Sequence, residues 1–146
     1  MSTEPAALGP AELHQQIGQG LVAAAPPGWV ELRMTQVQVG NAGQTLHRAV
    51  LTSGEEHGRW STAMDVGEAM YELRRLTYQP GKGAWYTAVV TVTSSGSISF
   101  DFDYDGEPEW DIEVVPESYV EDLEMFPRDE EHRPAWLREK LELAGR

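Results

Sequence analysis

The sequence contains no cysteine, and this absence removes several kinds of site at once. Without thiols the chain can form neither disulfides nor thiolate metal sites, and a chain of this kind fits a reducing cytoplasm. The N-terminal residues lack a basic start followed by an apolar run, so they do not resemble a signal peptide. No apolar stretch approaches the roughly 20 residues that a membrane span needs. These absences predict a cytoplasmic protein.

Recognisable catalytic motifs are missing as well. The chain has no G-x-S-x-G, no H-E-x-x-H and no glycine pattern that would hold a phosphate. Its histidines are scattered without the spacing of metal ligands, at His14, His47, His57 and His132. We therefore predict a protein that is not an enzyme and has no catalytic, cofactor-binding or metal-binding residues.

What the sequence does have is the composition of a globular domain and a segregated negative charge. The 146 residues are 40% hydrophobic and 24% charged, which predicts a packed core. The net charge is −13; residues 1–100 contribute −2, whereas residues 101–146 hold sixteen acidic and five basic side chains and contribute −11. Such a field repels nucleic acid and anionic membranes and attracts a basic protein. The alternative is that the acidity only keeps the protein soluble.

The pattern of apolar residues predicts an α+β fold in the order α-β-β-α-β-β-α-α. Leu13, Ile17 and Leu21 give the first helix an apolar stripe, and Asp65 with Glu68 has the spacing of a capping box at the second. We expect an antiparallel sheet packed with helices, a loose N-terminal leader over residues 1–9 and a single α+β domain over residues 10–146. The predicted strands are 29–39, 45–52, 84–93 and 97–105; the later helices are 64–79, 116–126 and 134–144, and residues 53–60 form a polar loop.

The second helix is expected to bury one side, and the last hairpin is the clearest in the chain. The buried side of the second helix is predicted to comprise Ala69 or Met70, Leu73 and Leu76. The hairpin consists of two alternating runs joined by a short Ser-Gly turn.

The segment "SISFDFDYDG" begins like a calcium-binding loop. Asp101, Asp103 and Asp105 read D-x-D-x-D-G, but the twelfth position, which should be a bidentate Glu, is Ile112. In a strand the three carboxylates instead share one face, and Phe100, Phe102 and Tyr104 share the other. We therefore expect Phe102 to be buried and the aspartates to face water. An exposed strand also lacks the apolar pocket that raises the pKa of a catalytic carboxyl group.

The acidic strand and the residues after it are the predicted partner-binding surface. Trp110 stands among carboxylates, as aromatic anchors of interfaces do; the alternative is a ring folded back over the sheet edge. The predicted partner-binding residues are Asp101, Asp103, Asp105, Glu107, Glu109, Trp110, Asp111 and Glu113.

The C-terminal half resembles the YezG-like family of bacterial immunity proteins. The similarity lies in a tryptophan-led strand, a turn with glycine and an acidic-aromatic D-Y pair, here Trp85, Gly96, and Asp103 with Tyr104. The downstream segment resembles the actinobacterial branch, with its D-L-x-x-F-P-R run and later P-x-W-L. The corresponding residues are Asp122, Leu123, Phe126, Pro127, Arg128, Pro134, Trp136 and Leu137.

The resemblance covers roughly residues 60–140 and implies a function. Proteins of this kind bind a cognate secreted toxin domain in the producing cell and neutralise it. Their toxins are often nucleases, and some degrade NAD. The family has no catalytic residues to transfer, and no toxin-contact residue is transferred either. The expected partner is thus a basic toxin domain whose active site the protein occludes; the alternative is an acidic protein-binding module or a chaperone-like partner protein without a link to toxins.

Overall fold

The protein has an α+β fold with an antiparallel sheet, and its elements follow the predicted order. The computed structural model describes residues 9–145, so the predicted leader lies outside the described residues except for Gly9. The helices are α1 (Pro10–Ala24), α2 (Met64–Leu76), α3 (Glu117–Met125) and α4 (Ala135–Leu143), with a 3-10 turn at Glu130–His132; the strands are β1 (Trp29–Val39), β2 (Ala42–Leu51), β3 (Glu56–His57), β4 (Thr87–Thr93) and β5 (Ile98–Asp103).

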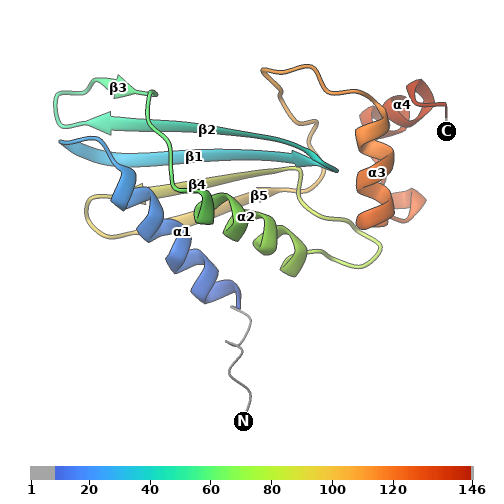
Figure 1. Cartoon of the computed structure of the whole chain (residues 1–146). Coiled ribbons are helices and arrows are strands. Elements are labelled where there is room, and N and C mark those ends of the chain that lie inside the picture. The colour runs from blue at the N-terminus through green and yellow to red at the C-terminus, as the bar shows by residue number, and fades with distance from the viewer. Residues whose placement is uncertain (1–8, 146) are drawn as a thin grey trace, which may run out of the picture.

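The sheet has the strand order β3-β2-β1-β4-β5, and every neighbouring pair is antiparallel. Helices α1 and α2 lie on the same side of the sheet, while α3 and α4 gather at one of its ends (Figure 1). The predicted fold class is therefore confirmed. The two-residue strand β3 is an addition, because it lies in the segment expected to be only a polar loop.

Apolar side chains fill the space between the sheet and the two long helices. Leu32 and Met34 of β1 pair with Val92 and Val90 of β4, so all four side chains point to the same side. The predicted stripe of α1 meets them, and the buried cluster consists of Leu13, Ile17, Leu21, Leu32, Met34, Ala49, Val66, Ala69, Met70, Leu73, Trp85, Ala88, Val90 and Val92. Its burial is the main stabilisation of this layer.

Helix α2 departs from the prediction in two details. It begins at Met64 with Ala63 as its N-cap residue, and no side chain caps it, so the predicted capping box of Asp65 and Glu68 is wrong. Leu73 is fully buried, but Leu76 is 37% exposed. The buried stripe continues through Arg74, which lies one position after Leu73.

The two faces of β5 are those that the alternation predicts. Phe100 and Phe102 pair with Val90 and Ala88 and point toward α1 and α2, while Asp101 and Asp103 point the other way. Phe102 is half-buried, not buried as expected, because β5 is the last strand of the sheet. Its ring stacks on Trp85 with 5.7 Å between centroids.

The residues after the sheet form a C-terminal lobe, residues 117–145, with its own small core. Helices α3 and α4 contribute Tyr119, Leu137 and Leu141, and the sheet end contributes Val39 and Tyr86. Trp136 packs on Tyr86 edge to face, with 5.2 Å between ring centroids. The lobe thus closes one end of the sheet with aromatic side chains.

A buried ion pair joins α2 to α3. The guanidinium of Arg74 donates two hydrogen bonds to the carboxylate of Asp122, at 2.7 and 3.0 Å, and a third to the carbonyl of Trp85 at 2.6 Å. Both side chains are 2% exposed. The same carboxylate accepts the backbone N–H of Gly40 at 2.8 Å. Gly40 has a φ of 56°, and a Cβ there would lie 2.7 Å from the carbonyl oxygen of Ser118, so this turn requires glycine.

A second buried arginine, Arg128, follows α3. It donates to the carboxylate of Asp105 at 3.0 Å and to the carbonyls of His132 and Ala84 at 2.9 and 3.2 Å, and it also bonds the carbonyl of Tyr104. Arg128 therefore connects the lobe to the end of β5. None of the helices in residues 9–145 has the length and apolar character that crossing a bilayer requires.

Candidate partner-binding surface

The face of the sheet opposite α1 and α2, called the open face below, is mostly polar. The strand register places these side chains on it: Glu31, Arg33, Thr35 and Val37 of β1; Gln44, Leu46 and Arg48 of β2; Thr87, Val89 and Thr91 of β4; and Asp101 and Asp103 of β5. Residues 104–116, called the acidic loop below, cross one end of this face. The side-chain amide of Gln44 binds that loop at both the Glu109 carbonyl (3.4 Å) and the Asp111 N–H (2.7 Å).

Three of the predicted partner-binding carboxylates have structural partners within the protein. Asp103 accepts the backbone N–H groups of Asp105 and Gly106, at 3.2 and 2.8 Å, and so shapes the turn after β5. The side chain of Asp105 pairs with Arg128. Glu107 lies 3.8 Å from the ammonium of Lys140 on α4. These contacts position the acidic loop on the molecule.

The other predicted carboxylates are exposed and have no ion-pair partner among residues 9–145. They are Asp101 on β5 and Glu109, Asp111 and Glu113 on the acidic loop. Their charge is therefore directed at solvent, where it is available to a partner.

Trp110 is half-buried and turned toward the C-terminal lobe. Its indole N–H donates to the hydroxyl of Tyr119 at 3.1 Å, and its ring packs against the core of the lobe. The ring therefore fixes the acidic loop to α3. A role of Trp110 as an interface anchor stays a prediction.

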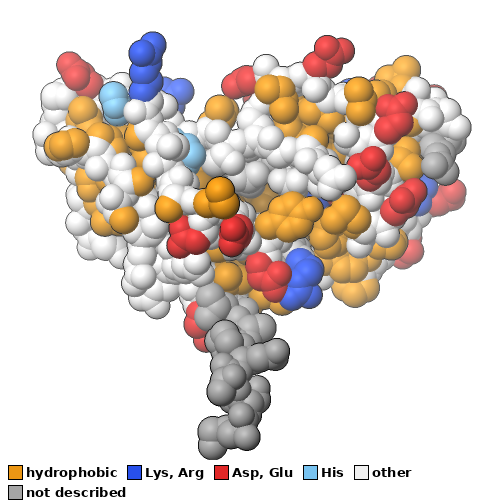
Figure 2. Space-filling model, in the orientation of Figure 1, with side chains coloured by type: hydrophobic (Ala, Val, Ile, Leu, Met, Phe, Trp, Pro, Cys, Tyr) orange, Lys and Arg blue, Asp and Glu red, His pale blue; other side chains and the backbone are white. Residues whose placement is uncertain are grey.

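Two hollows adjoin the acidic loop. One of about 260 Å³ lies between the loop and the open face, with Thr35 and Leu46 on the sheet side and Glu107 and Asp111 on the loop side. A larger one, of about 640 Å³, lies along β2 and reaches from Asp111 to Trp60. The surface in Figure 2 is notched along its upper edge, between the part over β3 and the part over the acidic loop.

Leu46 is the functional candidate that sequence reasoning missed. It lines both hollows and is 46% exposed, and carboxylates of the loop line the same hollows. A leucine in a strand ordinarily reads as core. The one signal in the sequence is its alternation with Gln44 and Arg48, which places it on a polar face.

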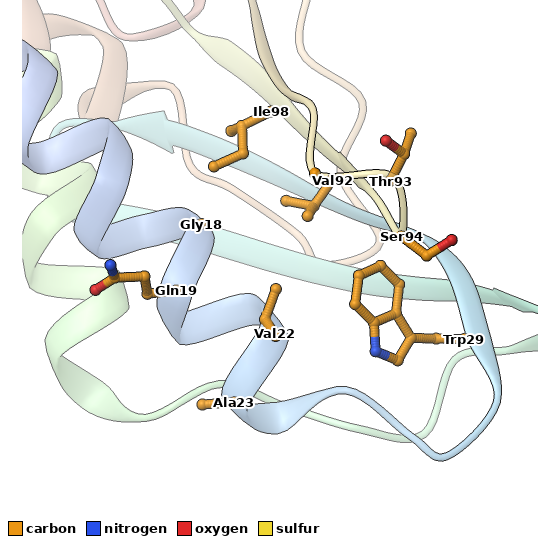
Figure 3. A pocket seen from close by; sticks show the side chains of 10 residues that line it. Gly18, Gln19, Val22, Ala23, Trp29, Val92, Thr93, Ser94 and Ile98 are labelled. Atoms are coloured by element: carbon orange, nitrogen blue, oxygen red, sulfur yellow. The ribbon is translucent and has the colours of Figure 1, made fainter.

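A third hollow, apolar and of about 450 Å³, lies between the end of α1 and the β4–β5 hairpin. Figure 3 shows Val22 of α1, Trp29 of β1 and Val92 and Ile98 of the hairpin around it. Polar side chains do not converge there. Its lining is mostly apolar and includes no charged side chain.

The stretch that begins like a calcium loop is used in another way. Of its three carboxylates, Asp103 holds a turn and Asp105 holds Arg128, as described above. Within residues 9–145 no group of three or more histidine or carboxylate side chains is arranged to hold a metal ion.

Burial shifts the pKa values of two tyrosines and two histidines. Desolvation raises the pKa of the Tyr86 and Tyr119 hydroxyls, and it lowers the pKa of the His14 and His47 rings. His14 stacks on Phe100 with 4.0 Å between ring centroids, and its Nε2 is buried without a hydrogen-bond partner among the described residues. These groups belong to packed regions.

No protein-family model matches the chain, and no curated protein matches it at a significant level.

Proposed function

We propose that the protein is a cytoplasmic, immunity-type inhibitor that binds a basic toxin domain, such as a nuclease or an NAD-degrading domain, and occludes its active site. The acidic loop and the open face form the binding surface. The protein acts by charge and bulk, with no chemistry of its own. The observation that carries this proposal is that Glu109 and Asp111, which have no ion-pair partner among residues 9–145, line the hollows beside the open face.

Charge supports a basic partner. The segment from residue 101 onward holds a net −11, and the structure directs Asp101, Glu109, Asp111 and Glu113 to solvent. A nuclease domain presents positive surface to hold phosphates. A carboxylate-lined surface competes for the same positive side chains and speeds association by long-range attraction.

The residues that carry the family resemblance have a structural explanation. Asp122 and Arg128 of the D-L-x-x-F-P-R run are the buried charges that hold the lobe to the sheet, and Phe126 lies under the Arg74 guanidinium at 4.8 Å. Trp136 donates to the carbonyl of Asp105 at 2.7 Å. These residues therefore have structural roles within this protein, and partner contacts are to be sought on the exposed surface instead.

The test is a binding measurement with the product of the gene next to this protein's gene, used as a variant in which any catalytic residue is replaced. Reversing two free charges, Glu109→Lys with Asp111→Lys, is expected to lower the association rate constant about tenfold or more at low salt and to flatten its salt dependence. Asp105 is unsuitable for this purpose, because its reversal would also break the contact with Arg128.

The matched control is Asp65→Lys with Glu68→Lys, which changes the net charge by the same amount on α2, across the sheet from the open face. It is expected to slow association much less. Absence of binding by the parent protein would refute the proposed function, and equal effects of the two charge reversals would refute the proposed surface. Stopped-flow tryptophan fluorescence at several salt concentrations measures the association rate constants of the parent protein and of both charge-reversal variants.

A further inference from the structure

Strand β5 is the last strand of the sheet, and its outer edge faces away from β4. The strand order ends at β5, and no strand lies beyond it in Figure 1. Within residues 9–145, β4 is the only strand that pairs with it. Past the end of the strand, Arg128 binds the carbonyl of Tyr104 and closes that end of the edge. Proteins ordinarily cover or shorten such edges, because exposed main-chain groups recruit other strands.

The register of the β4–β5 hairpin identifies which residues direct their N–H and C=O groups outward. Thr93 donates its N–H to the carbonyl of Ser97 at 2.9 Å, so these two residues form a hydrogen-bonded pair. Alternate residues of an antiparallel strand use the same edge. Asp101 therefore bonds to β4, whereas Phe100 and Phe102 direct their main-chain groups outward. Among the described residues no backbone group pairs with those outward groups.

On the open face this edge is acidic. Asp101 and Asp103 lie there, and neither β4 nor β5 carries a basic side chain. Arg33 on β1 is separated from β5 by β4 and lies 3.7 Å from Glu31. Opposite charges on neighbouring strands stabilise a pair, and like charges destabilise it. The open-face side therefore favours a basic segment over a second copy of β5, which would bring the same two carboxylates.

On the side toward the helices this edge is apolar. Phe100 and Phe102 are half-buried and Ile98 is 41% exposed, so apolar area remains uncovered along the strand. Ile98 also lines the apolar hollow of about 450 Å³, which continues to Val22 of α1 (Figure 3). The side chains of a strand alternate between its two faces. A segment in which basic and apolar residues alternate therefore matches both sides of the edge at once.

We infer that β5 receives an extended segment of the partner protein as an added strand, with basic and apolar residues in alternation. The segment pairs with the outward main-chain groups of Phe100 and Phe102, places a lysine or arginine beside Asp101, and directs apolar side chains toward Ile98 and the apolar hollow. The inference rests on the proposed function and adds the mode of binding. Main-chain hydrogen bonds supply affinity in such complexes, and alternate side chains supply specificity.

Proline substitution at Ile98 tests the main-chain pairing. By the same alternation the N–H of Ile98 points outward, and proline is tolerated at the first residue of an edge strand. Ile98→Ala is the matched control, since both variants lose the isoleucine side chain but only proline loses the N–H. The ligand is the product of the neighbouring gene with any catalytic residue replaced. Ile98→Pro is expected to have a dissociation constant at least tenfold above that of Ile98→Ala; equal values would overturn the added strand.

Charge reversal at Asp101 tests the basic character of the segment. Asp101→Lys is expected to raise the dissociation constant for the same ligand at least tenfold, because attraction to a neighbouring basic side chain becomes repulsion. Glu68→Lys, an exposed change of the same charge on α2, is the control and is expected to raise it less than threefold. Equal effects of the two substitutions would overturn the assignment of basic residues to this edge.

Amide hydrogen exchange followed by NMR gives a readout that does not depend on a variant folding. On complex formation the amides of Phe100 and Phe102 are expected to gain protection, while that of Asp101 is already protected by β4. Binding without a gain at Phe100 and Phe102 overturns the added strand and leaves the proposed function intact. Failure of the parent protein to bind refutes the proposed function, and the inference with it.

Protection of Phe100 and Phe102 in the free protein also overturns the inference. A free protein that is dimeric would then assign the edge to a second copy, and a monomeric one would assign it to another segment of the chain.

Discussion

Two regions of the molecule are stabilised in different ways. One is the layer in which α1 and α2 pack on the sheet, and the other is the C-terminal lobe. Between the helices and the sheet, aliphatic side chains such as Ile17, Leu32 and Val90 make a continuous apolar core. At the lobe, two buried arginines, Arg74 and Arg128, bind carboxylates and carbonyls among aromatic rings.

The two regions differ in how well they tolerate amino-acid substitutions. Apolar packing is non-directional, so the layer accepts adjustment of individual side chains at a graded cost. A buried charge requires its partner, because an uncompensated ion in the interior carries a large desolvation penalty. The lobe is therefore expected to depend on a few residues, although they add little apolar area.

The strongest test of this contrast is Asp122→Ala. The substitution leaves Arg74 buried without its counter-ion and Gly40 without an acceptor, so we expect a loss of about 3–5 kcal/mol in the free energy of unfolding. Asp122→Asn retains an oxygen for Gly40 and should cost less. Glu124→Ala, an exposed change on the same helix, is the control. Urea denaturation followed by tryptophan fluorescence gives the values; a cost for Asp122→Ala near that of Glu124→Ala would show that the lobe does not depend on the ion pair.

The second test compares the two faces of β5. Phe102→Ala is expected to cost about 2–3 kcal/mol, below the usual range for a fully buried aromatic, because its ring is half-buried. Alternation alone predicts almost no cost for Asp103→Ala. Since its carboxylate accepts two backbone N–H groups, we expect about 1 kcal/mol instead. Asp101→Ala is the control for the lost charge. Equal costs at Phe102 and Asp103 would contradict the assignment of faces.

The smallest expected effect is a pH dependence within the apolar layer. Burial lowers the pKa of His14, so the unfolded chain binds a proton more readily than the native protein. The contribution of the neutral ring is present above the unfolded pKa of about 6.5 and is lost as the pH falls from there toward the lower native value. The melting temperature should therefore decline between pH 7.5 and pH 5.5, and less steeply in His14→Phe. His47, whose pKa is lowered in the same way, accounts for part of the remaining slope. A slope that His14→Phe leaves unchanged would exclude the stacked ring as its source.

The sequence alone was sufficient for the four helices, the four longer strands and their order. The period of β1, the stripe of Leu13, Ile17 and Leu21 and the hairpin of β4 and β5 are local patterns, and local backbone geometry fixes which side of an element they occupy. Local patterns also explain the errors. The capping box at Asp65 is a match of spacing that the helix start did not use, and β3 is too short to carry a period.

The acidic loop shows what a local pattern does not contain. The sequence treated its carboxylates as equivalent, whereas Asp105 binds Arg128 and Glu107 binds Lys140 across the lobe. Trp110 likewise reads as an anchor from its charged neighbours, and its hydrogen bond to Tyr119 is visible only once α3 is placed. Immunity-type binding stays a proposal that the toxin-binding experiments decide.

Local periodicity therefore determined the α+β order of this protein, because each helix and strand must bury its own apolar side. Only the tertiary structure decided which charges are buried and which are free. Arg74 meets Asp122 across 48 positions of the chain, and Gln44 meets Asp111 across 67. Such pairs depend on how whole elements dock, and the sequence next to either residue does not indicate which partner it meets.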